Sequence, residues 1–521
     1  MRRYTDTLRR CGRDPLHPVS LTTTPPTVRY DWTLLAVLLL GLTVLRLVVR
    51  SNLDIDLHYD EAQYAVWSMQ PDWGYYSKPP LIAWAIAAAR GVCGDSAFCV
   101  RLPSAIAFTV TPLLVFALGR ELWPYRPSVA WLGAGLFTLA PLTNFYALFM
   151  TTDSLLLLCW SAALLVLVRA IRLGGGWWPL LGIALGFGLL AKYTMGIFAV
   201  SSVMALWLMP QLRRVLVMPG PWMALFIAVL MFAPNLWWNA VHDFPTWHHT
   251  AEIAQIDRAG NGLGGLFEFI GAQIVIFGPL AFAAAAYSVR RGLQAPVAPT
   301  DIGPGQAMPI PALRFLVCFA VPFLAIICVQ AGLSRAFANW AAPAYVAGSL
   351  LAASALLATR LRWLIAAALG TSLLLSALAY GHEALARAAG LNWEGPLHEV
   401  RGWSKLGRQV DALAQQHHAT LVLDDRKLAS EMGFYAGTSG RTLRIWNPTG
   451  ARQNQFQMTR DLRDLPQRDG AFLVISRREL QPALGAAFAE VTPLPVELSM
   501  SSGHRTTPLR VWLARDFSAY R

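Results

Sequence analysis

Long apolar runs separated by short polar segments fill residues 31–380 of the chain. Each run is about 17 to 25 residues long, the length that a helix needs to cross the hydrocarbon core of a bilayer. We read eleven runs, which begin near Trp32, Leu102, Ser128, Ser154, Trp178, Gly196, Pro221, Leu266, Phe315, Trp340 and Trp363. The pattern predicts a polytopic α-helical membrane protein with about 11 to 13 transmembrane helices.

Composition supports this class. Of the 521 residues, 55% are hydrophobic and 14% are charged, and the mean hydropathy is +0.43. A soluble core does not need so much apolar surface. The formal net charge is +13, but the basic residues form short clusters between apolar runs. This placement orients helices in a membrane, and we expect no nucleic acid partner.

The basic clusters also predict the orientation. If residues 1–30 form a cytoplasmic tail, every second loop contains an arginine pair such as Arg169 and Arg172, as the positive-inside rule requires. The first helix carries no cleavage site. With an odd number of spans, the region from residue 381 lies outside. We therefore predict a multi-pass protein of the bacterial inner membrane with a periplasmic C-terminus.

This arrangement requires that residues 79–92 do not cross the bilayer. Their apolar core is nearer 10 to 14 residues, which suits an interfacial helix. Residues 51–101 then form one long outer loop, which contains Cys93 and Cys99. An oxidising compartment permits a disulfide between them, and two unpaired cysteines are an equal alternative.

Residues 381–521 have a different pattern. Short runs rich in β-formers at 420–423, 442–446, 472–475 and 509–513 alternate with helical stretches such as 403–415. This alternation predicts a small extracytoplasmic α/β domain.

The first outer loop contains the strongest candidates for chemistry. Asp60 and Glu61 are adjacent acids, and on a helix only one of them faces a given site because neighbours project about 100° apart. Acids at this place can also cap a helix or be merely solvated. Lys78 precedes Pro79 and Pro80, which fix an extended entry into the next helix. Its ammonium group is thereby held at headgroup depth, where it can bind a phosphate.

A further acid, Asp153, lies at the outer end of the fourth span, on the same predicted membrane face. It can contribute to a site, serve as the N-terminal acid of its helix, or do both. Trp73, Tyr75 and Tyr76 precede Lys78 and can line a site or form an aromatic belt.

In their order and spacing, the segments DEAQYAVW, YYSKPPLIAW, RLPSAIAF and MTTDSLLLL resemble the glycosyltransferase family 39 superfamily of integral-membrane enzymes. Its members include protein O-mannosyltransferases and lipid A aminoarabinose transferases, which share the GT-C architecture and use polyprenyl-phosphate-linked sugars. The resemblance covers residues 31–380, and the later segments GFYAGTSG and NQF are similar to tails of bacterial relatives. It implies a GT-C catalytic domain followed by the outer domain.

The resemblance also implies roles for single residues. Asp60 matches the first-loop acid at the reaction centre, and Asp153 matches the acid that faces it. Lys78 resembles a lysine that contacts the donor phosphate. Tyr64 and Tyr76 match aromatic residues that line the same cavity.

Two departures leave the donor sugar open. Gln63 stands where the aminoarabinose transferases carry an arginine. Many bacterial relatives have Asp-His-Pro-Pro where this chain has the segment SKPP, residues 77–80.

Two further outer loops supply candidates. Loop 237–265 is expected to cover the cavity, with His242 or Arg258 on the donor phosphate, as similar loops of relatives do. Its segment HDFPTWHH also suggests a metal site, but the H-E-x-x-H pattern is missing. A short loop with Arg335 and Asn339 is a further candidate.

These residues suit glycosyl transfer, because a glycosyl phosphate needs charge neutralisation at the phosphate, stabilisation of an oxocarbenium-like centre and a base for the acceptor hydroxyl. We predict an inverting glycosyltransferase that uses a polyprenyl-phosphate sugar at the outer face of the inner membrane. Lipid A or another envelope glycolipid is the first choice of acceptor, and protein serine or threonine is the alternative. A divalent cation held by Asp60 and Asp153 is the cofactor that the acids suggest.

Two other classes compete with this interpretation. A transporter or lipid flippase would place charges in mid-membrane, whereas the acids of this chain cluster at one face. A non-catalytic assembly protein would use its outer domain to bind a partner and would tolerate loss of Asp60.

Overall fold

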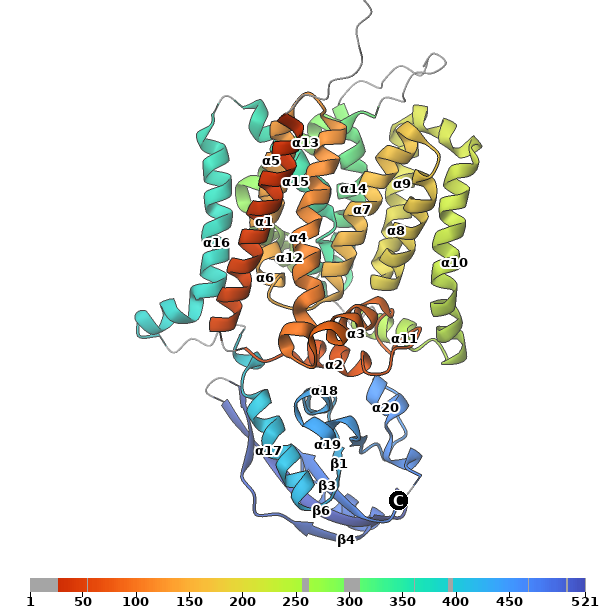
Figure 1. The fold of residues 1–521 in the computed structure, drawn as a ribbon, viewed down its shortest axis with the longest axis vertical. Helices are drawn as coiled ribbons and strands as arrows, with labels where there is room; N and C mark the ends of the chain where they lie inside the picture. The colour runs from red at the N-terminus through yellow and green to blue at the C-terminus, as the bar shows by residue number, and fades with distance from the viewer. Residues whose placement is uncertain are drawn as a thin grey trace, which may run out of the picture.

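The protein consists of a long helical bundle with a smaller α/β unit at one end (Figure 1). The computed structural model describes residues 27–53, 55–254, 262–294, 310–359, 361–391, 397–466, 468–502 and 505–520.

Six described helices are long and apolar enough to cross a membrane. They are α1 (Thr27–Asn52), α4 (Ala97–Leu122), α7 (Thr152–Leu173), α10 (Pro219–Val241), α14 (Ala312–Leu333) and α16 (Trp363–Ala388). Two bent pairs raise the number to eight if each pair is one span. Shorter apolar helices, α5 (Pro127–Leu139), α8 (Trp177–Ala191) and α15 (Ala344–Ala358), occupy three more of the predicted runs. Each of the eleven predicted apolar runs contains a helix. That the chain crosses the membrane eleven times stays a prediction.

The bent pairs have local causes. The helix α12 (Leu263–Phe277) meets α13 (Pro279–Gln294) at 107°. Gly278 between them has φ +94°, a left-handed conformation that favours glycine, and Pro279 cannot continue the backbone ladder of α12. The other pair joins residues Tyr193–Leu208, which include α9 (Ile197–Leu208), to Pro210–Val217 at 117°.

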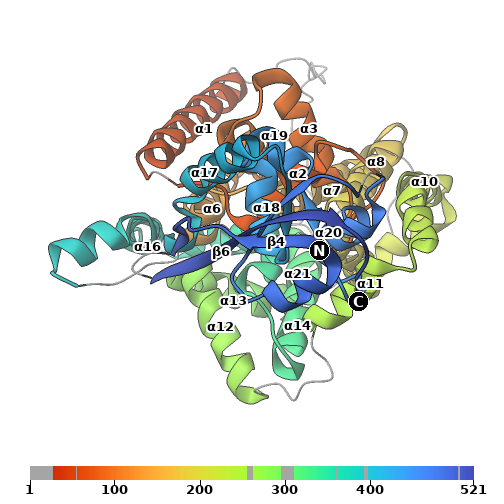
Figure 2. The same cartoon turned by 90° about the horizontal axis from the view of Figure 1, so that it is seen from below.

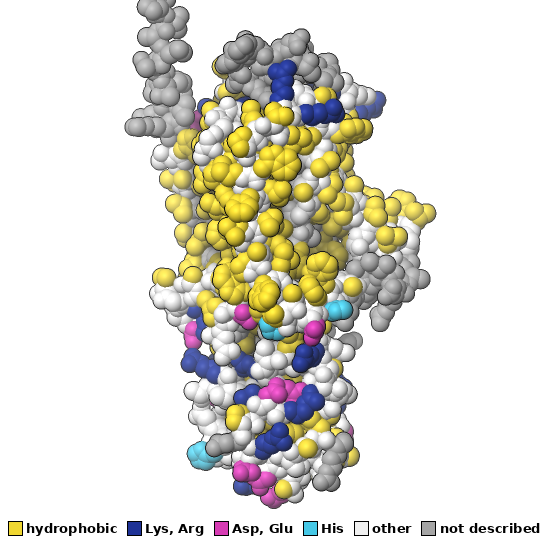
Figure 3. All heavy atoms as spheres, turned by 90° about the vertical axis from the view of Figure 1, so that its right-hand side faces the viewer, with side chains coloured by type: hydrophobic (Ala, Val, Ile, Leu, Met, Phe, Trp, Pro, Cys, Tyr) yellow, Lys and Arg dark blue, Asp and Glu magenta, His cyan; other side chains and the backbone are white. Residues whose placement is uncertain are grey.

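Apolar side chains cover the outside of the bundle as well as its core. Leu38, Val203 and Phe226 are 55%, 65% and 65% exposed, and Figure 3 shows a wide apolar surface over the bundle on the side of α10. A water-facing surface of this size would be an exception among soluble proteins. The prediction of a polytopic helical membrane protein with a small C-terminal α/β domain is confirmed.

Short helices form a layer between the bundle and the α/β unit. These are α2 (Tyr59–Trp67), α3 (Leu81–Cys93) and α11 (Pro245–Ala254), which lie across the end of the bundle (Figure 1). The short helix α6 (Pro141–Tyr146) precedes α7. The segment predicted to lie at the interface thus forms α3, a helix of 13 residues.

The α/β unit contains one mixed sheet. The helices are α17 (Trp403–Gln416), α18 (Arg426–Tyr435), α19 (Gly437–Arg441), α20 (Gln455–Thr459) and α21 (Gln481–Ala487). The strands are β1 (Thr420–Leu423), β2 (Arg444–Ile445), β3 (Ala471–Ser476), β4 (Phe488–Pro493), β5 (Leu498–Ser502) and β6 (Arg505–Phe517). Their order is β2-β1-β3-β6-β4, with β5 paired to β6. The strands β1, β2 and β3 are parallel, and β6 runs antiparallel to its neighbours.

The α/β unit is docked on the first loop. Tyr435 of α18 accepts a hydrogen bond from the Leu57 backbone at 2.7 Å, and Gln455 accepts one from the Tyr76 backbone at 2.7 Å. Val66 of α2 belongs to the apolar core of the α/β unit. Viewed from below, the unit lies over α2 and the centre of the bundle (Figure 2).

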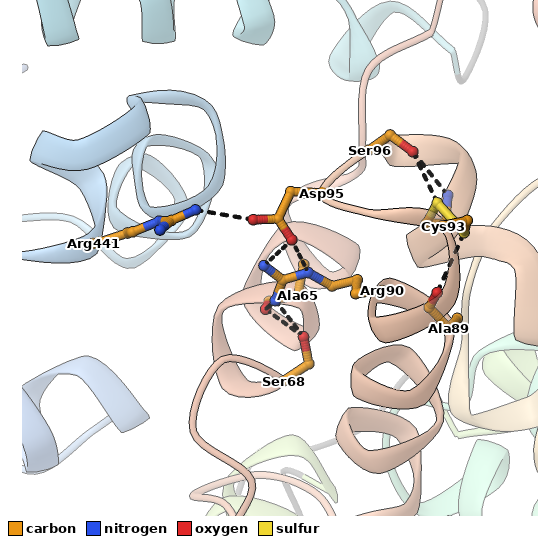
Figure 4. Close-up of polar contacts among 9 residues, drawn as sticks. Ala65, Ser68, Ala89, Arg90, Cys93, Asp95, Ser96 and Arg441 are labelled. Atoms are coloured by element: carbon orange, nitrogen blue, oxygen red, sulfur yellow. Dashed lines mark hydrogen bonds and ion pairs between the residues drawn. A yellow bond between two sulfur atoms is a disulfide. The ribbon is translucent and has the colours of Figure 1, made fainter.

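A second docking contact lies beside the two loop cysteines, which form a disulfide. Between Cys93 and Cys99, Asp95 accepts hydrogen bonds from Arg90 at 2.8 and 2.5 Å and from Arg441 of α19 at 3.0 Å. Figure 4 shows how this carboxylate joins the loop to the α/β unit. The disulfide therefore closes the short loop that carries one of the docking residues.

Candidate functional site

The helix α2 carries both adjacent acids and uses one of them for structure. Arg101 of α4 donates to the two oxygens of Glu61 at 2.8 and 2.7 Å. The backbone N–H groups of Met150 and His58 add bonds at 2.6 and 2.9 Å. These four bonds saturate a carboxylate that is 1% exposed. These bonds give Glu61 a structural role, which is to fix the loop to the bundle, and a catalytic role for it stays a prediction.

Asp60 projects from the same helix in another direction. Its side chain is 40% exposed, and its Oδ1 lies 3.5 Å from Nη2 of Arg426, the first residue of α18. A helical step of about 100° explains why Asp60 and Glu61 have different surroundings. Of the two acids, Asp60 is the one that a ligand can reach.

Asp153 lies in the first turn of α7 and is buried. Its Oδ1 accepts a bond from Lys192 Nζ at 2.6 Å, and its Oδ2 accepts one from Asn339 at 2.8 Å. The carboxylate is thus favourably placed near a helix N-terminus and is also paired with a cation. Lys192 and Asn339 come from two loops that are remote in sequence, so Asp153 organises this face of the bundle.

Tyr64 of α2 connects the two aspartates. Burial raises the pKa of its phenol well above the ordinary value, and the charges of Asp60 and Asp153 act in the same direction. Both carboxylates therefore lie within electrostatic range of one side chain. The roles at a reaction centre that the resemblance implies for Asp60, Tyr64 and Asp153 stay predictions.

Lys78 lies in a tight turn that returns the chain to α3. Tyr75 and Lys78 exchange backbone hydrogen bonds at 3.2 and 3.4 Å. The Lys78 ammonium group makes no hydrogen bond or ion pair with any residue in the described part of the chain. Burial lowers its pKa below the ordinary 10.5, and Lys192 acts in the same direction, whereas Asp60 and Asp153 oppose the shift. A half-buried cation without a direct partner is suited to an anionic ligand.

The helices α10 and α11 hold this turn in place. Trp238 Nε1 donates to Asp72 at 2.8 Å, and Asn235 Nδ2 donates to the Trp73 carbonyl at 2.7 Å. The Thr246 hydroxyl donates to the Tyr75 carbonyl at 3.1 Å. Lys78 is therefore positioned by contacts with residues more than 150 positions away.

An aromatic pair lies beside Lys78. The ring centroids of Tyr76 and His249 are 5.2 Å apart. Burial lowers the pKa of His249 to about 4, and the positive charges of Lys78 and Arg426 act in the same direction. His249 is thus neutral at physiological pH and lies close to both cations.

Three residues predicted to contact the donor phosphate, His242, Arg258 and Arg335, are not placed at the charged cluster by the described part of the structure. We define this cluster as Asp60, Lys78, Asp153, Lys192, His249 and Arg426. His242 binds the Trp238 carbonyl at 2.7 Å and stacks on the Trp238 ring, so the structure gives it a local role. Arg335 is exposed and lies over the Phe337 ring at 4.5 Å. Among the described residues, neither side chain contacts the charged cluster. The loop of Arg335 contributes Asn339 instead. Arg258 lies outside the described residues.

Three residues of the cluster, Lys192, His249 and Arg426, were not predicted from the sequence as donor ligands or catalytic groups. Lys192 could have been noticed because the chain has few lysines. His249 belongs to the histidine-rich loop, where His242 was the preferred candidate. Arg426 has no signal in the sequence, because the docking of the α/β unit brings it to α2.

The donor set does not fit a divalent cation. Both oxygens of Asp153 are bonded, one of them to an ammonium group, and Asp60 lies beside Arg426. No group of three histidine, cysteine or acidic side chains suited to a metal occurs in the described ranges. Hard cations require several free oxygen ligands. We therefore assign no chemical step to a metal.

The fold and the cluster define a polytopic membrane protein with a charged site at the end of its bundle, and comparisons with known proteins show which proteins it is similar to. Residues 77–238 match the family described as dolichyl-phosphate-mannose-protein mannosyltransferase. A lipid A galacturonosyltransferase of Rhizobium johnstonii, RgtD, is 29% identical over 81% of this chain and 86% of its own length.

Two further comparisons agree. An undecaprenyl phosphate-alpha-4-amino-4-deoxy-L-arabinose arabinosyl transferase of Pectobacterium carotovorum is 30% identical over 38% of this chain and 39% of its own length. The crystal structure of ArnT from Cupriavidus metallidurans bound to undecaprenyl phosphate has the same fold, with a TM-score of 0.60, 17% identity and coverage of 93% of this chain and 98% of ArnT. These similarities confirm the resemblance found in the motifs, since the proteins that this chain is similar to are glycosyltransferases.

Proposed function

We propose that the protein transfers a sugar from a polyprenyl-phosphate donor to lipid A or a related envelope glycolipid. The ammonium group of Lys78 carries this proposal, because it has no bonding partner among the described residues and lies within electrostatic range of the carboxylates of Asp60 and Asp153. A phosphodiester supplies the anion that Lys78 lacks. The names of the relatives support the donor and the acceptor, since they include two transferases for which lipid A or an undecaprenyl-phosphate sugar is named.

The apolar part of the donor has a suitable surface next to the turn. A groove of about 500 Å³ is lined by Trp73 and by residues of α10, which are Leu230, Ala233, Pro234, Trp237, Trp238 and Val241. Trp73 lies five residues before Lys78 in the same turn. A polyprenyl chain in this groove would keep the phosphate at the end of the bundle, because the groove is apolar and the cluster is charged.

In the proposed reaction, Lys78 binds the donor phosphate and Asp60 accepts the proton of the acceptor hydroxyl. The acceptor oxygen forms a bond to the anomeric carbon as the bond from that carbon to the phosphate oxygen breaks, and the electron pair leaves with the phosphate. A single displacement inverts the anomeric configuration. Asp153, held by Lys192, stabilises positive charge that develops at the sugar.

We also propose that the charged cluster faces the periplasm. The helices α4 and α7 begin near the cluster and end at Arg120 and Arg172, so these arginines lie at the opposite end of the bundle. The positive-inside rule places that end in the cytoplasm. The α/β unit has no cysteine, so Glu490→Cys adds a single thiol there, and this thiol should react with a membrane-impermeant reagent in intact cells, with the wild-type protein as the background control. Labelling only after permeabilisation would show that the α/β unit lies in the cytoplasm and would contradict the proposed orientation.

Transfer by purified protein in liposomes tests the function. The donors would be polyprenyl phosphates of galacturonic acid, 4-amino-4-deoxyarabinose and mannose, and the acceptors lipid A and a peptide with serine and threonine. Asp60→Asn should lower kcat by about 10²- to 10⁴-fold, and Lys78→Ala should mainly raise the KM for the donor. Asp243→Asn is the matched control, because the Asp243 side chain is 91% exposed.

The outcomes separate the alternatives. Transfer to the peptide but not to lipid A would show that the acceptor is protein serine or threonine. Undiminished activity of Asp60→Asn would show that Asp60 is not the base. Loss of transfer after treatment with a chelator, with recovery on addition of Mg²⁺ or Mn²⁺, would revive the metal hypothesis. Absence of transfer from every donor would contradict the proposal.

A further inference from the structure

Arg426 of the α/β unit reaches the charged cluster of the bundle. It is the first residue of α18, and the preceding Asp425 caps this helix through a bond from the Leu428 backbone at 3.0 Å. The helix α18 packs against α2. The Arg426 guanidinium lies over the Tyr59 ring at 5.2 Å and donates to Gln63 Oε1 at 3.2 Å. Its position is thus defined by side chains of α2.

The contacts of Arg426 leave capacity for a ligand. A guanidinium has five N–H donors, and in the described part of the chain this one bonds to two neutral groups, the amide of Gln63 and the side chain of Tyr59. Its distance to Asp60 is 3.5 Å, compared with 2.6 Å between Lys192 and Asp153. The Arg426 side chain is also 34% exposed. A planar donor fork in such a setting suits a phosphate.

The charges of the cluster point to one more anion. Lys78, Lys192 and Arg426 are cations, and Asp60 and Asp153 are carboxylates, so one positive charge is uncompensated. A phosphodiester carries one negative charge. Because Lys192 is paired with Asp153, the cations that remain for this ligand are Lys78 and Arg426, and both lie within electrostatic range of His249.

We infer that Arg426 binds the donor phosphate together with Lys78, so that the α/β unit supplies part of the donor site. This inference rests on the proposed function, since it concerns the same donor. The bundle alone would then hold an incomplete site. Docking of the α/β unit would then be required for donor binding.

Binding of polyprenyl phosphate without a sugar tests the inference independently of transfer. The full-length protein in detergent would be titrated with this lipid, and Arg426→Gln should weaken its binding by about 10- to 100-fold, the usual effect of losing a charged hydrogen bond. Arg426→Lys should retain an intermediate affinity. In the Arg426→Gln background, Gln63→Arg should restore much of the binding, because it returns a guanidinium to the same place from α2.

Two controls separate ligand binding from docking. Arg441→Gln removes the ion pair with Asp95 but leaves Arg426 unchanged, and it should bind the lipid as wild type does. Lys427→Gln removes a neighbouring cation that pairs with Glu399, and it should have little effect on binding.

Each result decides a specific point. Wild-type affinity in Arg426→Gln would overturn the inference while leaving the proposed function intact. Equal losses in Arg426→Gln and Arg441→Gln, or failure of Gln63→Arg to restore binding, would show that Arg426 acts through docking and would also overturn it. If wild type neither binds polyprenyl phosphate nor transfers a sugar, the proposed function itself fails.

Discussion

The protonation state of Lys78 should determine the pH above which the enzyme loses activity. Only the protonated form of Lys78 can neutralise a donor phosphate, and burial lowers its pKa below the ordinary 10.5. The value of kcat/KM should therefore fall as the pH rises through this lowered pKa of the free enzyme. Lys78→Arg should shift the alkaline limb to higher pH, because a guanidinium stays charged.

The measurement is kcat/KM for the donor between pH 6 and 10.5. Lys405→Arg makes the same exchange at an exposed position of the α/β unit and should leave the profile unchanged. An identical alkaline limb in wild type and Lys78→Arg would show that another group controls it.

At the residue scale, sequence analysis could select Lys78, Asp60 and Asp153 as candidates, because local motifs carry them, and the structure places both carboxylates within electrostatic range of Lys78. It could also predict that one of Asp60 and Glu61 faces away from the site, but not which one. That choice depends on Arg101, 40 positions further along the chain.

Arg426 could not be predicted, because its contact with Gln63 joins residues 363 positions apart. Gln63 stands where the aminoarabinose transferases carry an arginine. In this structure the guanidinium of Arg426, from the α/β unit, lies beside Gln63. A local motif contains no information about such a contact.

At the scale of elements, the turn that carries Lys78 depends on close packing against α10. A Cβ atom on Gly74 would lie 2.6 Å from Cδ2 of Trp238, which itself binds Asp72. Gly74→Ala should therefore displace the turn or Trp238 and lower kcat/KM by about 10- to 100-fold, since small displacements at a reaction site have effects of this size.

Gly91→Ala in α3 is the matched control, because a Cβ there meets no atom within 4 Å. It should keep full activity and slightly favour the helix. The measurement is transfer at saturating and limiting donor, with apparent Tm as the check on folding. Full activity of Gly74→Ala would show that the turn does not require this packing.

The elements themselves were largely predictable. Apolar runs locate the helices of the bundle, and the short run at 79–92 predicts the helix that became α3. The bends were not predictable from hydropathy, because apolar segments continue on both sides of Gly278 and Pro279. The strands β4 and β5 were missed because their sequences, FAEVTP and LSMSS, lack a strong apolar pattern.

At the scale of the whole molecule, the joint between the bundle and the α/β unit contains a buried acid. Glu431 of α18 is 0% exposed, and neither carboxylate oxygen has a hydrogen-bond partner among the described residues. Burial raises its pKa well above the ordinary 4.5, and the charges of Asp56 and Glu61 act in the same direction. The docked state therefore favours the protonated acid.

The sign of the pH effect follows from proton linkage. Above pH 4.5 the unfolded chain releases the Glu431 proton, while the native protein retains it up to its higher pKa. In that interval the native state binds more protons, so its stability falls as the pH rises. One group contributes at most about 1.4 kcal/mol per pH unit.

Glu431→Gln should flatten this dependence, because the amide has nearly the same shape and never ionises. Apparent Tm between pH 5 and 9 would be compared for wild type, Glu431→Gln and Glu490→Gln, whose parent side chain is 66% exposed. The stabilisation of Glu431→Gln relative to wild type should grow with pH, while Glu490→Gln should follow wild type. Parallel curves for all three proteins would mean that Glu431 does not limit docking. A difference in apparent Tm between Glu431→Gln and wild type that widens with pH would show that Glu431 is protonated at the interface between the two units.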